Sequence, residues 1–140
     1  MSFNYSGLIF FRAFDGYDFE ARLEKFLPRG FSVGVSPGFR IPQEDGHRAY
    51  WFYAGPRKYF EKDHGGVFVG VEPFVGTVQD GGWERVAGVP ITFGYVSQYD
   101  RISTGMNAGL GPGYRWTPGA RDGQGFEMVG MIDINVGFTF

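Results

Sequence analysis

The side chains of this chain that could do chemistry are carboxylates and guanidinium groups at alternate positions of short segments. From Asp18 to Glu24 every second residue is charged. Successive side chains of a β-strand point to opposite sides, so this spacing gathers the charges on one face. Other segments share the pattern, and the predicted charge network comprises Arg12, Asp18, Glu20, Arg22, Glu24, Arg40, Arg57, Glu72, Glu84, Arg115, Glu127 and Asp133.

Two kinds of chemistry are open to this set. A facing pair of carboxylates could cleave a glycosidic bond, one acting as acid and the other as base or nucleophile. Packed among arginines, the same carboxylates would pair and hydrogen-bond, because an enclosed charge without a partner is strongly unfavourable. We favour the ion-pair network, since acids and arginines occur on the same face.

The two histidines are the other candidates for catalysis. His47 and His64 fall in glycine- and charge-rich breaks that would lie at opposite ends of the fold, and neither has a serine in an H-x-S arrangement. We expect both to be solvated loop residues. The sequence therefore predicts no catalytic set, and we do not expect an enzyme.

Metal and phosphate sites are also weakly indicated. Two breaks carry carboxylate pairs that could bind a divalent ion weakly: Glu44 with Asp45, and Glu61 with Asp63. Neither has the spacing of an EF-hand. The stretch Gly109–Gly113 is glycine-rich, but it lacks the Lys-Ser/Thr pair and the following helix of a phosphate loop. The sequence predicts no metal site and no cofactor.

The elements that must position these residues are β-strands. Breaks rich in glycine and charge divide the chain into eight segments, a pattern typical of an all-β meander in a single domain, residues 1–140. In most segments the charges and glycines share one face and the apolar side chains the other. The segments are 2–14, 17–27, 31–41, 49–60, 67–77, 83–99, 102–116 and 125–140.

The last segment, Gly125–Phe140, has the clearest alternation. Its even positions are apolar almost throughout, whereas its odd positions carry two acids, an amide and a hydroxyl. It is longer than the roughly 5–6 residues of an ordinary strand. It would be long enough to cross a bilayer, which takes about 9–11 tilted residues.

This amphipathic final segment with its C-terminal Phe resembles the closing strand of bacterial outer-membrane β-barrels. In that family the segment also acts as the signal read by the barrel-insertion machinery, and the matching residues here are Ile132, Ile134, Val136, Phe138 and Phe140. The resemblance implies an eight-stranded antiparallel up-and-down transmembrane β-barrel with short turns, similar to the OmpA transmembrane domain and OmpX-like barrels.

The resemblance also implies a place and a role. We expect a monomer in the outer membrane of a Gram-negative bacterium, with the lipid bilayer and the insertion machinery as partners. The expected role is structural or membrane-anchoring, with the charge network filling the lumen. Residues 1–10 lack the basic region and cleavage site of a signal peptide, so we expect the mature form of an exported protein with an added Met.

Composition agrees with these expectations. A mean hydropathy of −0.19 and the lack of any long apolar run argue against a spanning helix. A net charge of −2 gives no electrostatic case for nucleic acid. Because the chain has no cysteine, it has no disulfide scaffold and no thiolate metal site.

Aromatic residues make up 19% of the chain, and we expect the outward ones to form a belt at each end of the apolar band. One predicted belt comprises Tyr17, Tyr50, Trp83, Trp116 and Phe126. The other comprises Phe3, Tyr5, Phe31, Phe60, Tyr95, Tyr99 and Phe140.

Five prolines fall inside the predicted strands: Pro37, Pro56, Pro73, Pro90 and Pro112. Because proline removes a ladder donor, and most of these have a glycine nearby, we expect bulges or register shifts at these points.

Three other functions remain open. A soluble lipocalin-like barrel that binds a lipid would need its apolar face inward. A lipid-modifying outer-membrane enzyme would act through loop residues. A small channel would need a lumen less crowded than the one predicted here.

Overall fold

The computed structural model of this chain describes residues 3–6, 11–13, 16–42, 47–61, 65–79, 82–119 and 124–139. Its twelve strands form one antiparallel sheet, which confirms the predicted all-β, antiparallel class. The strands are β1 (Phe3–Ser6), β2 (Phe11–Ala13), β3 (Gly16–Glu20), β4 (Arg22–Leu27), β5 (Phe31–Pro42), β6 (Arg48–Tyr59), β7 (Gly66–Val71), β8 (Phe74–Gln79), β9 (Trp83–Gly88), β10 (Ile91–Tyr99), β11 (Ile102–Trp116) and β12 (Gly125–Thr139). A short 3-10 turn, η1 (Pro28–Gly30), joins β4 to β5.

The count of twelve differs from the predicted eight because four predicted segments each contain two strands. β1 and β2 share the first segment, β3 and β4 the second, β7 and β8 the fifth, and β9 and β10 the sixth. The other four segments are the single strands β5, β6, β11 and β12, whose ends lie within one residue of the predicted ones. Within the described residues, no helix is long and apolar enough to cross a membrane.

Prolines explain three of the four interruptions. One lies at Ala21, opposite Pro37, and the other two contain Pro73 and Pro90. At each of them a proline carbonyl accepts a hydrogen bond from the neighbouring strand, for example from Glu72 N to Pro90 O at 3.1 Å. Proline has no N–H to return the second bond of the pair. The ladder therefore loses one bond at each interruption.

The register nevertheless runs on unchanged across these interruptions. Before one of them Tyr53 pairs with Phe74. After it Arg57 pairs with Gly70, the same number of residues further along both strands. The same continuity holds at Pro37, Pro56, Pro90 and Pro112. The expectation of bulges or register shifts at the prolines is therefore wrong, because each proline removes a hydrogen bond without displacing the strand.

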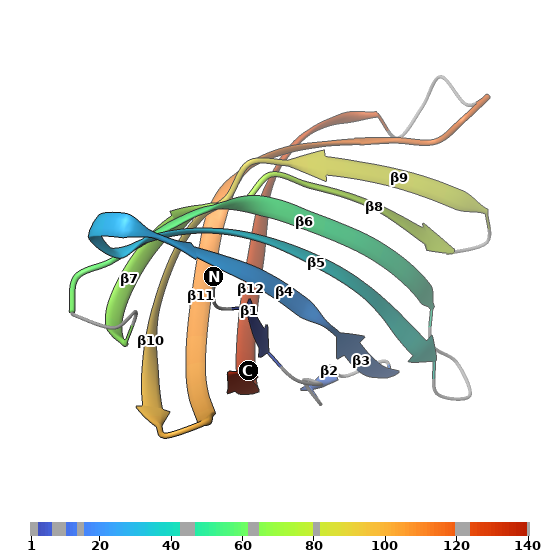
Figure 1. The fold of residues 1–140 in the computed structure, drawn as a ribbon. Helices are drawn as coiled ribbons and strands as arrows, with labels where there is room; N and C mark the ends of the chain where they lie inside the picture. Colours follow the sequence, from blue (N-terminus) through green and yellow to red (C-terminus); the bar gives the residue numbers. More distant parts are fainter. Residues whose placement is uncertain are drawn as a thin grey trace.

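At the end of the molecule where β1 and the last residues of β12 lie, each strand pairs with the next, and the last pairing leads back to the first strand. Around this circuit β12 pairs with β1, β1 with β4, β4 with β5, β5 with β6, β6 with β7, β7 with β10, β10 with β11, and β11 with β12. Figure 1 shows the sheet curving round to bring β1 beside β12.

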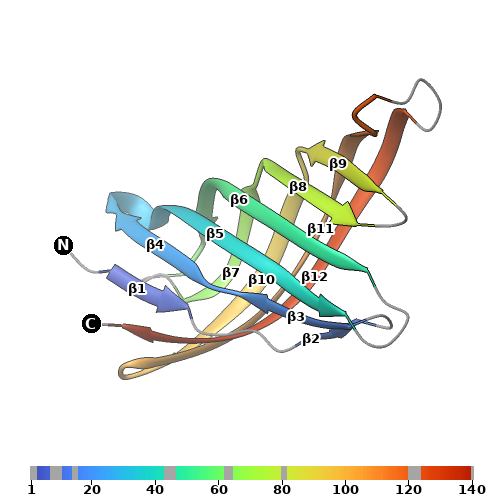
Figure 2. The same ribbon diagram turned by 90° about the vertical axis from the view of Figure 1, so that its right-hand side faces the viewer.

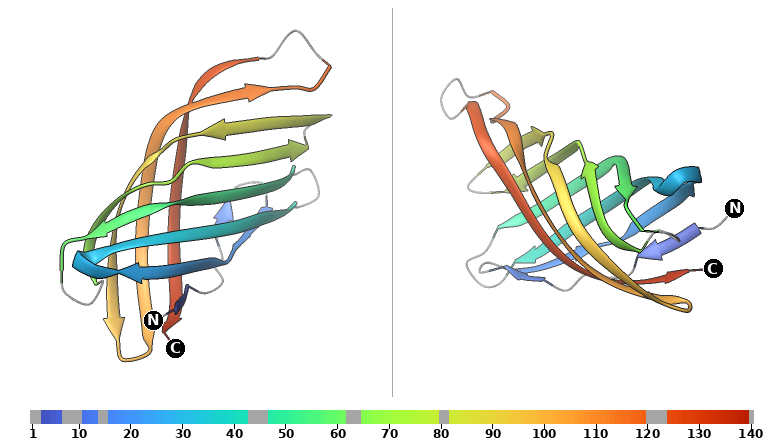
Figure 3. Two further views of the ribbon diagram at one scale, coloured as in Figure 1. Left: turned by 45° about the horizontal axis from the view of Figure 1, so that its top comes forward. Right: turned by 90° about the vertical axis from the view of Figure 1, so that its left-hand side faces the viewer.

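The opposite end has a different set of pairings. Among the residues that the structure describes, β2 pairs only with β3, and the part of β12 from Gly125 to Val136 pairs only with β11. In Figure 2 both termini and the β10–β11 turn lie at one end of the molecule, and the start of β12 lies at the other. Figure 3 shows from two further sides how the strands tilt and curve between these ends.

The two faces of the sheet differ in exposure. Most outward side chains are apolar and exposed, with Phe93 at 61% and Ile132 at 65% of full exposure. Inward side chains such as Phe68 and Glu72 are at 0%. The core therefore lies within the curved sheet and contains charged residues, as the alternation predicts.

Candidate functional site

The enclosed charge cluster consists of two arginines and two glutamates: Arg22, Glu24, Arg57 and Glu72. The first two lie in β4 and Arg57 lies in β6, while Glu72 falls between β7 and β8. Their side chains are at most 5% exposed. Alternation within each strand turns all four inward, and the curvature of the sheet brings them together.

Positive and negative groups alternate within the enclosed charge cluster. Glu72 accepts hydrogen bonds from Arg57 Nη2 at 2.9 Å and Nε at 3.1 Å, and from Arg22 Nη1 at 2.5 Å. Arg22 Nε also donates to Glu24 at 3.3 Å. Two positive and two negative charges cancel, and the two-pronged contact from Arg57 is the geometry in which such pairs are strongest. This balance offsets the desolvation of four buried charges.

Hydroxyl groups and aromatic rings complete this cluster. Ser32 Oγ and Tyr59 Oη both donate to Glu24 Oε1, the tyrosine at 3.0 Å. The Tyr59 ring lies 5.3 Å from that of Phe68, and the guanidinium carbon of Arg57 lies 4.3 Å from the Phe68 centroid. The predicted network did not include Ser32, Tyr59 or Phe68, although all three occupy inward positions of the alternation.

Inward glycines make room for the large side chains. A Cβ built on Gly34 would lie 2.4 Å from Arg22 Nη2, and one on Gly94 would lie 2.4 Å from the Phe68 ring. Large inward groups therefore lie across glycines of neighbouring strands. Glycines and charges share a face because the enclosed side chains need this space.

Glu20 has a different partner. Trp51 Nε1 donates to Glu20 Oε2 at 3.0 Å, and a Cβ on Gly38 would lie 2.2 Å from the same indole nitrogen. The alternation places Trp51 inward, but it does not identify the carboxylate that the indole would meet.

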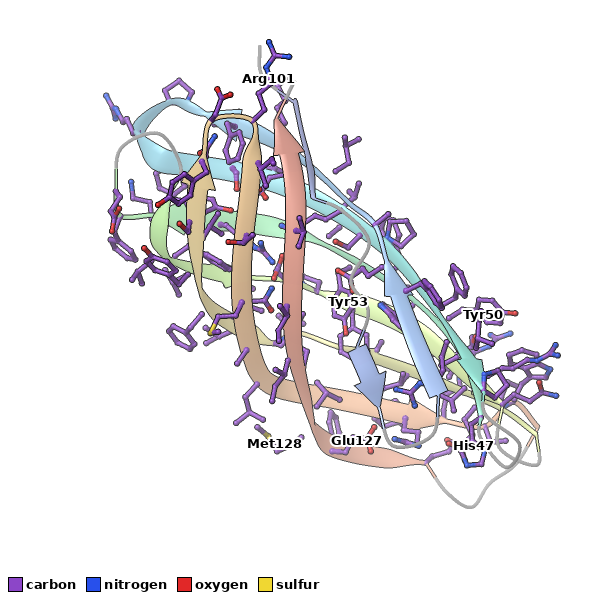
Figure 4. The ribbon with its side chains drawn as sticks, turned by 90° about the horizontal axis from the view of Figure 1, so that it is seen from below. His47, Tyr50, Tyr53, Arg101, Glu127 and Met128 are labelled. Carbon is purple, nitrogen blue, oxygen red and sulfur yellow. The ribbon has the colours of Figure 1, made fainter. Side chains whose placement is uncertain are left out.

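A second charge group lies nearer the end opposite the termini. Arg115 donates to Glu84 at 2.9 Å and to Glu127 at 3.0 Å. The three side chains are 28–42% exposed, so solvent weakens these pairs. Figure 4 shows Glu127 on the inner side of the sheet and the next residue, Met128, on the outer side.

Four residues of the predicted network remain: Arg12, Asp18, Arg40 and Asp133. Arg40 is half-buried in β5 and makes an interaction of its own. The backbone register sets Asp18 opposite Arg40, and Asp133 opposite Asn107. The side chains of Arg12, Asp18 and Asp133 lie outside what the structure describes.

The predicted insertion-signal residues lie on β12. Ile132, Ile134 and Val136 point outward and are 65%, 55% and 43% exposed. Phe138 belongs to the same strand, but its side chain lies outside the described part of the chain, as does the whole of Phe140.

The arrangement of the enclosed carboxylates suits ion pairing better than hydrolysis. Both oxygens of Glu72 accept hydrogen bonds from arginine, and both oxygens of Glu24 are also engaged. An acid–base pair would need to face a substrate instead. His47 is half-buried ahead of β6, and His64 lies outside the described residues. Nowhere in the described residues do three or more metal-binding side chains of His, Cys, Asp or Glu gather.

Comparison with models of protein families, with curated proteins and with solved structures finds no match.

Proposed function

We propose that this chain is an integral outer-membrane protein, an eight-stranded antiparallel up-and-down β-barrel with a structural or membrane-anchoring role. The observation that carries the proposal is the distribution of charge and exposure. Phe126, Ile132 and Ile134 are 89%, 65% and 55% exposed, whereas Arg57 and Glu72 are 4% and 0% exposed. A water-soluble protein rarely leaves so continuous an apolar surface uncovered.

Strand length and pairing support the barrel. β5 and β6 have 12 residues each, and β11 and β12 have 15. Each exceeds the roughly 9–11 tilted residues that cross a bilayer. The unchanged register at the prolines joins β3 with β4, β7 with β8 and β9 with β10 into single spans. Taking β1 and β2 together as one more span gives eight. Closing such a sheet satisfies the backbone within lipid.

The outward aromatic residues support two interfacial belts. Near the end opposite the termini, the ring of Tyr50 lies 6.3 Å from that of Trp83, and the ring of Tyr114 lies 5.2 Å from that of Phe126. At the terminal end, four members of the second predicted belt are also exposed: Phe31, Phe60, Tyr95 and Tyr99. Aromatic rings at both edges of an apolar band are typical of membrane barrels.

The alternatives receive less support. A lipocalin-like carrier would enclose its apolar face, and here that face is exposed. A channel would need a free path, and the ion pairs of Arg57 and Glu72 occupy the interior. A lipid-modifying enzyme would need a catalytic set, which neither the loops predicted from the sequence nor the described residues provide.

The test is whether the protein needs detergent and has heat-modifiable gel mobility. The proposal predicts that the refolded protein stays soluble only in detergent or vesicles, and that unboiled and boiled samples migrate differently. A variant that tests the lipid face is Ile134→Asp. It places a carboxylate on that proposed face and should impair insertion. A monodisperse monomer in detergent-free buffer would overturn the proposal.

The same proposal gives β12 a role in assembly. The sequence alternation continues its outward positions to Phe138 and Phe140, and we propose that this segment is the one that the insertion machinery reads. Phe140→Ala should then slow assembly into outer-membrane vesicles that contain the machinery, while leaving spontaneous refolding in detergent unchanged.

A further inference from the structure

An apolar groove of about 210 Å³ lies on the outer face of β5, β6 and β7. Its walls include Phe31, Pro56, Val69 and Val71. Cross-strand pairing sets Lys58 between Phe31 on one side and Val69 on the other. The groove therefore has an apolar floor, and Lys58 is the one cation of its lining whose side chain points outward.

The ammonium group of Lys58 points toward the terminal end of the sheet. Its Nζ donates to the carbonyl oxygen of Arg29 in η1 and lies 4.5 Å from the centre of the Phe31 ring. None of the ion pairs between described residues includes Lys58 or the exposed Arg29. A long side chain that covers apolar surface with its stem and carries its charge to the edge is well suited to a membrane interface.

The few charges on the mostly apolar outer face are positive. The outward charged side chains in the described parts of the strands are all cations: Lys25, Arg48, Lys58 and Arg85. The carboxylates of those strands, in contrast, point inward. An anionic group that approaches the groove at Lys58 would therefore find positive charge there, and outward strand carboxylates would not oppose it.

We propose that this groove binds one acyl chain of an anionic phospholipid, with its phosphate held by Lys58 and Arg29. The inference rests on the proposed function, which puts the outer face in lipid. The apolar walls suit an acyl chain, and the two cations favour a headgroup with net negative charge over a zwitterionic one. The site would lie in the leaflet nearest the chain termini.

The test counts bound lipids on the detergent-solubilised protein by native mass spectrometry during titration with phosphatidylglycerol or phosphatidylcholine. Phosphatidylglycerol should bind more tightly to the wild type. Lys58→Gln should weaken that binding by about fivefold, the factor expected for one lysine at an anionic surface, and should leave phosphatidylcholine unchanged. Arg85→Gln, which removes an outward cation at the opposite end, is the matched control and should bind like the wild type.

Two further measurements test whether the bound group is a lipid rather than free phosphate, and whether the lipid lies in the groove. Inorganic phosphate should not displace the lipid, because it has no acyl chain. Val71→Trp should fill the groove and weaken binding of both lipids. Equal binding of the two lipids to the wild type, or unchanged binding by Lys58→Gln, would overturn the lipid site alone, provided the same samples show heat-modifiable mobility. Solubility without detergent would overturn the barrel and the lipid site together.

Discussion

At the scale of single residues, the enclosed charge cluster depends on balance rather than on any one pair. Glu72 receives hydrogen bonds from both Arg22 and Arg57, and Glu24 receives one from Arg22. Each arginine is thus compensated only while both glutamates are ionised and in place. Removing one glutamate would leave two guanidinium groups sharing one carboxylate in a water-poor interior.

We therefore predict that Glu72→Gln strongly destabilises the protein. Breaking a buried pair by removing one partner typically costs about 3–5 kcal/mol. The free energy of unfolding should be measured by urea titration in lipid vesicles, with gel mobility as the readout. The control is Glu84→Gln, which breaks a half-exposed pair and should cost less than about 1 kcal/mol. Equal effects of the two substitutions would contradict the enclosed cluster.

At the scale of elements, the prolines show how a sheet tolerates residues that cannot donate. Four backbone N–H groups donate to proline carbonyls at or beside the interruptions, at 3.0–3.1 Å: those of Ala21, Ala54, Glu72 and Val89. Each N–H keeps its ladder partner even though the returning bond is missing. Neighbouring strands stay in register because one bond, together with the intact pairs on both sides, is enough to fix their alignment.

Hydrogen exchange provides a prediction for these interruptions. The amide protons of Ala21, Glu72 and Val89 should exchange slowly, like those of uninterrupted strands, because each is bonded to a carbonyl in the adjoining strand. Amides in the turns at Asp100 and Gly119 serve as controls and should exchange fast. NMR of the protein in detergent micelles measures both sets. Fast exchange at the three interruptions would indicate loops in place of continuous spans.

The strands also show what can be predicted from the sequence. The segment ends follow from the glycine- and charge-rich breaks. The inward and outward faces follow from alternation, because a strand has a period of two. Partners do not follow, since they depend on the register between strands. The contacts of Trp51 with Glu20 and of Arg57 with Glu72 join different strands, and the position of Glu72 opposite Pro90 is also a matter of register.

At the scale of the whole molecule, a short contact completes the circuit. β1 and β12 are joined by three residue pairs, Asn4 with Thr139, Tyr5 with Phe138 and Ser6 with Gly137. The first and last strands of the chain thus hold the two ends of the sheet together. The outward face that results is apolar around most of the circuit, which makes its orientation toward lipid the property on which the proposed function depends.

Two tryptophans on opposite faces of the sheet test that orientation. Trp83 lies on the outer face and is 47% exposed, whereas Trp51 points inward and donates to Glu20. One variant keeps only Trp51 (Trp83→Phe with Trp116→Phe), and the other keeps only Trp83 (Trp51→Phe with Trp116→Phe). In vesicles of lipid brominated on the acyl chains, fluorescence should be quenched strongly for Trp83 and weakly for Trp51.

Heat-modifiable mobility of both variants establishes that each has folded before the two are compared. The difference in quenching should arise because bromine must approach the indole closely, and an enclosed Trp51 is screened by the sheet. Equal quenching, or stronger quenching of Trp51, would mean that the inner face contacts the acyl chains. The charged inner face would then have to lie against acyl chains, which is so unfavourable that the eight-span barrel would have to be abandoned.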